Sequence, residues 1–148
     1  MPNHIYRVVL DTNQIVAAGT GWLEHGRPSF DNNTCRRVLI HVAESHTGLY
    51  CGKIIGEYLE KLIDLNHPPE RAQKLITYLI GAFERVVIVT SAAPAKPSDP
   101  DDEVFLLCAL DGQAHYLVSD DGALLNLKQS YTRPVIGGST ELAPLLSA

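Results

Sequence analysis

The hydrophobic pattern of the chain alternates between short β-branched runs and longer stretches of helical periodicity. Strands are predicted at residues 5–10, 49–51, 86–90, 116–119 and 134–136. This alternation is typical of a parallel sheet in which helices connect successive strands. The run Val8-Val9-Leu10 is apolar without alternation, as expected for a strand that is covered on both faces. The pattern therefore predicts an α/β fold with the first strand at the centre of its sheet.

Helices are predicted between these strands, at about residues 12–18, 34–46, 53–65, 69–83, 100–111, 121–127 and 139–147. In helix 53–65 the apolar residues form one broad stripe at about 100° per residue, which predicts an amphipathic helix packed on a core. Segment 104–110 is apolar on all sides. It predicts a helix buried in the middle of the domain.

Two stretches are predicted to be loops, residues 19–33 and 91–100. The first is long for a connection within a domain, and long loops are often functional. Its aromatic residues, Trp22 and Phe30, are candidates for contacts with a partner. The alternative, which is favoured, is that they anchor the loop to the body of the domain.

Composition predicts a single globular domain over residues 1–148. The chain is 45% hydrophobic and 20% charged, which excludes a disordered chain. A chain of this length can bury a core without disulfides or a structural metal. The net charge is 12 − 17 = −5, and the basic residues are scattered singly apart from Arg36-Arg37. The chain thus lacks the basic stripe of a tight, nonspecific nucleic-acid binder, although a nucleic-acid substrate remains compatible with it.

Cysteine usage and the first residues of the chain predict a cytoplasmic protein. Cys35, Cys51 and Cys108 are widely spaced among apolar neighbours, a pattern that indicates small buried hydrophobic residues in a reducing compartment. The apolar run that ends at Leu10 is far too short for a signal peptide or a membrane-spanning helix.

Acidic residues stand where two predicted strands end. Asp11 directly follows the first strand, and Asp120 and Asp121 directly follow strand 116–119. Ligands of open α/β sheets bind at the carboxyl ends of the strands. These side chains are therefore expected to face one cleft.

Further acids are expected to reach the same cleft. Asp101 and Asp102 open the predicted buried helix, and Glu57 lies at the rim of the apolar stripe of helix 53–65. Carboxylates that share a cleft repel one another and raise each other's pKa, and a divalent cation removes this cost. An all-oxygen, acidic site suits Mg²⁺ or Mn²⁺ rather than zinc.

Each of these acids also has a purely structural interpretation. Asp11 and Asp99 can cap the helices that follow them, and Asp120-Asp121-Gly122 can form an ordinary turn. Glu57 can pair with Lys61 at i, i+4. For one or two of the acids capping is the favoured interpretation, so the prediction of a site rests on the whole set.

Four motifs resemble those of the PIN-domain nucleases, and within them the toxin components of toxin–antitoxin pairs. The motifs are Val8-Val9-Leu10-Asp11-Thr12-Asn13, Glu57-Tyr58-Leu59, Asp99-Pro100-Asp101-Asp102-Glu103-Val104-Phe105-Leu106 and Tyr116-Leu117-Val118-Ser119-Asp120-Asp121-Gly122-Ala123-Leu124-Leu125. In order and spacing they span nearly the whole chain, and their combination is more specific than the first motif alone. The resemblance implies a PIN-like, three-layer α/β/α sandwich around a central, mostly parallel sheet of about five strands.

The resemblance also implies roles for individual residues. The residues that it makes metal-binding and catalytic are Asp11, Glu57, Asp102 and Asp121. Asp101 and Asp120 compete with their neighbours as metal ligands. Asn13 and Ser119 match polar positions beside the site, and Ser119 is expected to hydrogen-bond a carboxylate or a bound water.

The sequence departs from the family pattern at three places. Glu103-Val104 stands where Asp-Lys is more common, Asp120 where Gly or a basic residue is more common, and Ala123 where Asp is frequent. These departures leave open which of two adjacent acids binds the metal. They do not remove the acidic cluster.

The activity that the resemblance implies is hydrolysis of RNA phosphodiester bonds by a metal-dependent endoribonuclease. Bound Mg²⁺ or Mn²⁺ would activate and orient a water molecule and stabilise the leaving oxygen. The implied partners are RNA, an antitoxin protein, for which residues 19–33 are a candidate contact, and a second copy of the chain as a homodimer, with no membrane. The alternative is a catalytically inactive PIN-fold module that binds or acts as a scaffold.

Other classes of site fit the sequence less well. A haloacid-type phosphohydrolase needs a second aspartate two residues after the first, and position 13 is Asn. A phosphoacceptor receiver domain needs an acid pair at the end of the first strand. A dinucleotide-binding fold needs a glycine-rich first turn, and the chain has Asp11-Thr12-Asn13-Gln14 there. His41 and His46 are five residues apart, whereas zinc helices use i, i+4.

Overall fold

The computed structural model describes residues 4–20 and 33–147, and in this part of the chain five parallel strands form one sheet. They are β1 (Arg7–Leu10), β2 (Thr47–Tyr50), β3 (Glu84–Arg85), β4 (Tyr116–Val118) and β5 (Val135–Gly137). The order across the sheet is β3-β2-β1-β4-β5. Val9 of β1 lies opposite Leu49 of β2 and Leu117 of β4. The predicted central position of the first strand is confirmed.

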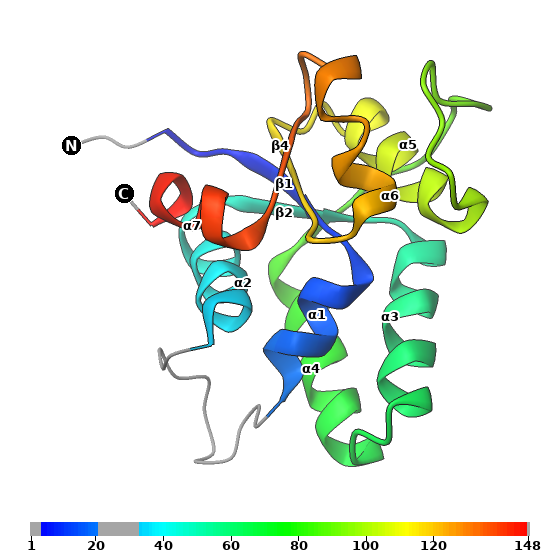
Figure 1. Cartoon of the computed structure of the whole chain (residues 1–148). Coiled ribbons are helices and arrows are strands. Elements are labelled where there is room, and N and C mark those ends of the chain that lie inside the picture. The colour runs from blue at the N-terminus through cyan, green and yellow to red at the C-terminus, as the bar shows by residue number, and fades with distance from the viewer. Residues whose placement is uncertain (1–3, 21–32, 148) are drawn as a thin grey trace.

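Helices connect the strands and cover both faces of the sheet. They are α1 (Thr12–Gly19), α2 (Thr34–Ser45), α3 (Gly52–Asp64), α4 (Pro69–Ala82), α5 (Glu103–Asp111), α6 (Gly122–Leu125) and α7 (Ser139–Leu146), with 3-10 turns at Pro100–Asp102 and Lys128–Ser130. α1 to α4 lie on one side of the sheet and α5 lies on the other (Figure 1). This layering confirms the predicted α/β/α sandwich. The helix predicted at 100–111 is divided into a 3-10 turn and α5.

The core lies between the sheet and the helices, as the apolar patterns predict. β1 is fully buried after Arg7, and the stripe of α3 directs Ile54, Tyr58 and Leu62 into the core. α5 is buried along most of its length. The elements that lead to the predicted site are therefore anchored by packing on both faces of the sheet.

The prediction of a strand at residues 86–90 is wrong. β3 ends at Arg85 because its partner, β2, ends at Tyr50. The Val86 amide still donates to the Tyr50 carbonyl at 2.7 Å. Beyond this bond, the Val89 amide donates to the Asp111 carboxylate at 2.7 Å instead of to a strand. Val89 is consequently 81% exposed, although its sequence neighbourhood is apolar.

The predicted loop at 91–100 and two of the three predicted buried cysteines agree with the structure. Residues 91–99 contain neither helix nor strand, whereas residues 21–32, with Trp22 and Phe30, lie outside the described residues. Cys51 and Cys108 are buried, Cys35 is half-buried, and all three are free thiols. Within residues 4–20 and 33–147, every helix is too short or too polar to cross a bilayer.

Candidate functional site

The ends of two neighbouring strands supply the most deeply buried part of the site. β1 and β4 pair in parallel, so Asp11 and Ser119 follow them side by side. Asp11 is 3% exposed. Its Oδ1 accepts the Gln14 amide at 3.1 Å and caps α1, while its Oδ2 accepts the Ser119 hydroxyl. The expected hydrogen bond from Ser119 to a carboxylate is therefore present. Asp11 both caps α1 and forms part of the site.

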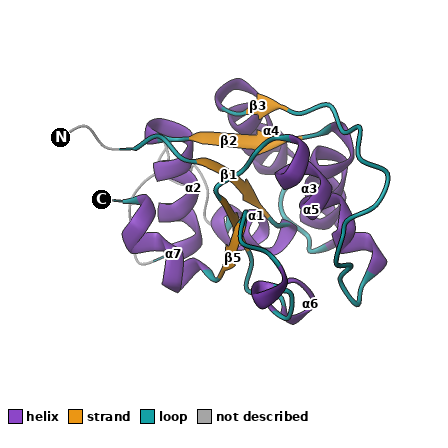
Figure 2. Ribbon diagram, turned by 90° about the horizontal axis from the view of Figure 1, so that it is seen from above, coloured by secondary structure: helices purple, strands orange, loops and turns teal. Residues whose placement is uncertain are grey.

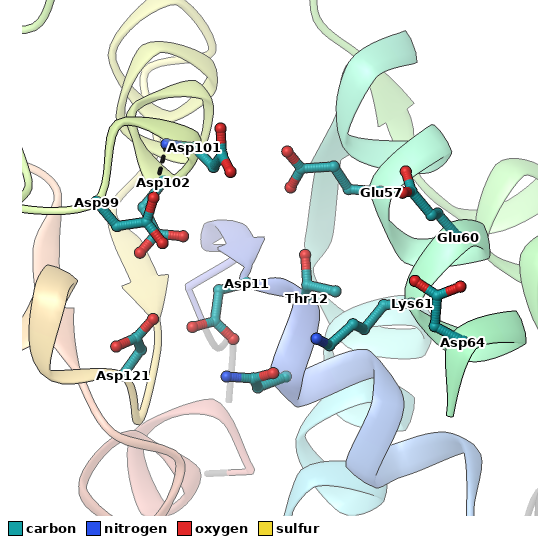
Figure 3. Close-up of a pocket in the computed structure, with 11 residues that line it drawn as sticks. Asp11, Thr12, Glu57, Glu60, Lys61, Asp64, Asp99, Asp101, Asp102 and Asp121 are labelled. Carbon is teal, nitrogen blue, oxygen red and sulfur yellow. Dashed lines mark hydrogen bonds between the residues drawn. The ribbon is translucent and has the colours of Figure 1, made fainter. Parts of the chain in front are cut away.

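α3 brings Glu57 to the same edge of the sheet. The next residue, Tyr58, is fully buried, and its hydroxyl donates to the Leu10 carbonyl at the end of β1. This contact holds α3 against the backbone that leads into Asp11. Glu57 points from α3 toward Asp101 across the cleft (Figure 3).

The turn before α5 carries three further carboxylates. Asp99 caps this turn, because its Oδ1 accepts the Asp101 amide at 3.0 Å. Asp102 Oδ2 is buried, and no hydrogen-bond donor of the described residues reaches it. A buried carboxylate oxygen without a donor is costly unless a proton or a cation lies against it.

These acids line one cleft with a volume of about 330 Å³ (Figure 3). They come from the end of β1, from α3, from the turn before α5 and from the end of β4. The predicted convergence of distant acids on one cleft is therefore observed. The lining residues are Asp11, Thr12, Asn13, Glu57, Glu60, Lys61, Asp64, Asp99, Asp101, Asp102 and Asp121.

Of the predicted acidic ligands, Asp120 is the one that the structure turns away from this cleft. Its Oδ2 accepts Gln14 Nε2 at 2.7 Å and the Ser139 hydroxyl at 2.8 Å, and its Oδ1 accepts the Ser139 amide at 3.0 Å. These bonds join the end of β4 to α1 and α7. Asp121 lines the cleft, and its Oδ1 also caps α6 by accepting the Ala123 amide at 3.1 Å.

Burial and mutual repulsion disfavour ionisation of Asp11 and Asp102. Burial raises the pKa of Asp11 to about 6, against a hydrogen bond from Ser119 that favours the ionised form. Burial also raises the pKa of Asp102 to about 7, and the charges of Asp121 and Asp99 add to the rise. Without a cation, these acids therefore hold protons at a pH where exposed aspartates are fully ionised.

Glu57 experiences a weaker form of the same effect. Burial raises its pKa, and the charges of Lys53 and Asp101 act on it in opposite directions. The cation that lowers the pKa of Glu57 is thus Lys53, one turn earlier on α3, rather than the Lys61 suggested by the sequence. Lys61 itself lines the cleft.

The donor set fits a hard divalent cation. The acids supply only oxygen ligands, which suit Mg²⁺ or Mn²⁺, and a cation would relieve the repulsion between them. As the side chains stand, no group of three or more His, Cys, Asp or Glu within residues 4–20 and 33–147 is arranged to hold a metal ion. Gathering ligands around one ion would therefore require rotation of side chains into the cleft.

Sequence reasoning missed several residues of the cleft. Glu60 and Asp64 line it together with Lys61, one and two turns after Glu57 on α3. Their spacing from Glu57, at i+3 and i+7, is the signal that places them on one helix face. Thr12 also lines the cleft, between Asp11 and the predicted Asn13, both of which line it too.

Comparisons with known proteins agree with this geometry. Residues 7–123 match the PIN domain family, and no curated protein matches the sequence. Among solved structures, the fold resembles a chain in the crystal structure of VapBC2 from Rickettsia felis bound to a DNA fragment from their promoter, with a TM-score of 0.53. The two chains are 13% identical in sequence, and the matched region covers 89% of this chain and 98% of the other. It shows a shared fold.

The segment that matches the family includes β1 to β4 and all the acids of the cleft. It covers most of the chain, from the first strand to the residues after β4. The resemblance read from the four sequence motifs is thereby confirmed. The chain belongs to the PIN domain family.

Proposed function

We propose that this chain is a metal-dependent endoribonuclease that hydrolyses RNA phosphodiester bonds and acts in the cytoplasm as the toxin of a toxin–antitoxin pair. The observation that carries the proposal is the convergence of acids from four segments on one cleft. PIN domains are generally nucleases that use divalent metal ions. The proposed ligands are Asp11, Glu57, Asp102 and Asp121.

Two of these choices rest on the surroundings of adjacent aspartates. Asp121 is proposed over Asp120 because both oxygens of Asp120 already accept hydrogen bonds outside the cleft. Asp102 is proposed over Asp101 because Asp102 Oδ2 is buried in the cleft without a donor. Asp101 would then lie at the exposed rim of the ligand set.

The side chains around the cleft supply orientation and proton transfer. When bound, Mg²⁺ or Mn²⁺ would lower the pKa of a water molecule and stabilise charge on the leaving oxygen. The Ser119 hydroxyl orients Asp11 through Oδ2. An acid of the cleft that does not hold the ion, such as Asp101 at the rim, would serve as the general base toward the water.

RNA and metal depend on each other in this proposal. The chain has a net charge of −5, and the cleft is lined mainly by carboxylates. Such a surface repels a polyanion until cations neutralise the local field. The ion therefore has a role in substrate binding as well as in catalysis.

The proposed protein partners are an antitoxin and a second copy of the chain. The antitoxin rests on the motifs that resemble toxin components and on the fold shared with a chain of the VapBC2 complex. An antitoxin would inhibit by covering the cleft. A homodimer is favoured by exposed aliphatic side chains on α3 and α4, where Ile63 and Ile80 are 52% and 47% exposed.

The test is cleavage of single-stranded RNA by the purified chain. We expect cleavage with Mg²⁺ or Mn²⁺, none with a chelator, and a rate lower by on the order of 100-fold or more for Asp11→Asn, because a metal ligand is lost. Glu70→Gln on α4 is the matched control, since the Glu70 side chain is 83% exposed and lies outside the cleft lining. It should retain the full rate.

Two results would contradict this proposal. Undiminished cleavage by Asp11→Asn would exclude the acidic cleft as the active site. No cleavage of several RNAs in either metal would favour the alternative, a catalytically inactive PIN-fold module that binds or acts as a scaffold.

A further inference from the structure

A second cavity adjoins the acidic cleft. Its volume is about 410 Å³, and it lies between the start of α3, the residues after β3 and the first two turns of α5. Figure 2 shows the chain after β3 running past α3 and α5. The two cavities have no lining residue in common but are neighbours, because Lys53 precedes Glu57 by one turn of α3 and Pro100 lies between Asp99 and Asp101.

The charge of this second cavity is opposite to that of the cleft. Lys53 and Arg85 line it, both are exposed, and neither forms an ion pair with another residue in the described part of the chain. The single acid in its lining is Glu103, whose Oε2 accepts the Ala93 amide at 2.9 Å. Two cations that form no ion pair among the described residues thus stand beside a cleft that is crowded with carboxylates, and the charge of Lys53 also acts on Glu57 in that cleft.

The remaining wall of this cavity is apolar. It is formed by aliphatic side chains from the segment after β3 and from α5, and Val87 among them is 73% exposed. Ligand pockets typically combine an apolar wall with a few polar groups that fix orientation, at volumes of roughly 300 to 1,000 Å³. An apolar wall with two cations suits a ligand that has a flat apolar part and a phosphate, which describes a nucleotide.

We propose that this cavity is a subsite for a nucleotide of the RNA strand that flanks the nucleotide in the acidic cleft. Its phosphate would lie against Lys53 and Arg85, and its base against Val87 and Leu107. The inference rests on the proposed function and names a part of the substrate beyond the cleaved bond. It also gives a polyanion two cationic contacts next to a cleft that would otherwise repel it.

The test is fluorescence anisotropy of a fluorescein-labelled, single-stranded oligouridine of about eight residues, a length within the usual site sizes of single-strand binders. All proteins keep the wild-type acids of the cleft and are measured in Ca²⁺, a larger cation that takes a different coordination geometry from Mg²⁺. Gel electrophoresis of the probe after each titration checks that it stays intact. We expect Lys53→Gln and Arg85→Gln each to weaken binding about 3- to 10-fold. Each should also reduce the slope of the logarithm of the binding constant against the logarithm of the salt concentration by about one, because one phosphate contact is lost. Val87→Asp should weaken binding to a similar extent.

The matched control is Lys74→Gln on α4, which removes the same charge away from both cavities. Lys74 is 58% exposed and pairs with Glu70, and its variant should bind like the parent. Thermal unfolding of each variant checks that the fold is retained.

Three outcomes overturn the subsite: no binding by the parent, unchanged affinity in Lys53→Gln and Arg85→Gln, or an equal loss in Lys74→Gln. The last would mean that net charge alone attracts the probe. This assay measures binding, so its result is independent of the cleavage assay. If the chain cleaved no RNA but the variants changed binding as expected, the proposed nuclease activity would be wrong and the proposed subsite would be retained.

Discussion

Asp120 and Asp121 are neighbours in the chain with different surroundings. Asp121 lines the acidic cleft, whereas Asp120 accepts hydrogen bonds from Gln14 and Ser139 outside it. Asp121→Asn should therefore lower the affinity for Mn²⁺ by on the order of 10-fold or more. Asp120→Asn should instead lower the free energy of unfolding by about 0.5 to 1.5 kcal/mol, because the amide group cannot accept all three bonds and the exposed position lets water replace part of them.

Calorimetric titration with Mn²⁺ and unfolding in urea separate these two effects. Each variant is the control for the other, since both remove one negative charge at adjacent positions. If Asp120→Asn lost the metal affinity and Asp121→Asn kept it, the ligand assignment at this strand end would be reversed.

Single residues also show how far the sequence predicts the candidate site. Asp11 and the acids after β4 are predictable as neighbours, because adjacent parallel strands end at the same edge of the sheet. The choice between Asp120 and Asp121 is not, because Gln14 and Ser139, from distant parts of the chain, orient the Asp120 side chain. No local pattern in the sequence carries that information.

At the level of elements, α3 is joined to the sheet by the bond from the Tyr58 hydroxyl to the Leu10 carbonyl. Tyr58→Phe should lower the free energy of unfolding by about 1 to 3 kcal/mol, because a fully buried hydrogen bond is lost. The same helix carries Glu57, so the affinity for Mn²⁺ should also fall. Urea unfolding and calorimetric titration measure the two effects.

Tyr50→Phe on β2 serves as the comparison, because it removes a hydroxyl from a partly exposed tyrosine outside the cleft. Wild-type stability and metal affinity in Tyr58→Phe would show that this bond does not position α3.

A helix or strand can be predicted from the sequence where the pattern of its own apolar side chains is enough to specify how it is buried. The apolar runs of β1 and α5 and the stripe of α3 specify burial directly, and the structure agrees with each. The run at 86–90 has the composition of a strand, but a strand also needs a partner. β2 ends at Tyr50, so the ladder ends with the Val86 amide. The length of a neighbouring strand is not encoded in the residues that would pair with it.

For the whole molecule, the raised pKa values link stability to pH. Asp11 has a pKa of about 6 and Asp102 of about 7, both above the ordinary value of 3.8. The folded state therefore binds more protons than the unfolded state in this range. The stability that these groups contribute is fully present below about pH 4 and is lost as pH rises through about 6 to 7.

Asp102→Asn isolates this effect from other titrating groups. Its melting temperature relative to the wild type, both without metal, should increase from pH 4 to pH 7.5, roughly the interval between the unfolded and folded pKa values. Mg²⁺ should stabilise the wild type more at the upper pH, where the ligands ionise readily. Scanning fluorimetry across this range measures both. A constant difference between the two proteins would mean that Asp102 titrates normally.

The most direct test of the shared cation site is a crystal structure of the chain with Mn²⁺, using anomalous scattering to locate the ion. We expect Mn²⁺ in the acidic cleft, with oxygens of Asp11, Glu57, Asp102 and Asp121 at roughly 2.0 to 2.3 Å, the range for a small divalent cation. Asp120 should remain bonded to Ser139. A cleft without Mn²⁺ at saturating concentration, or an ion held by Asp120 instead, would contradict the assignment.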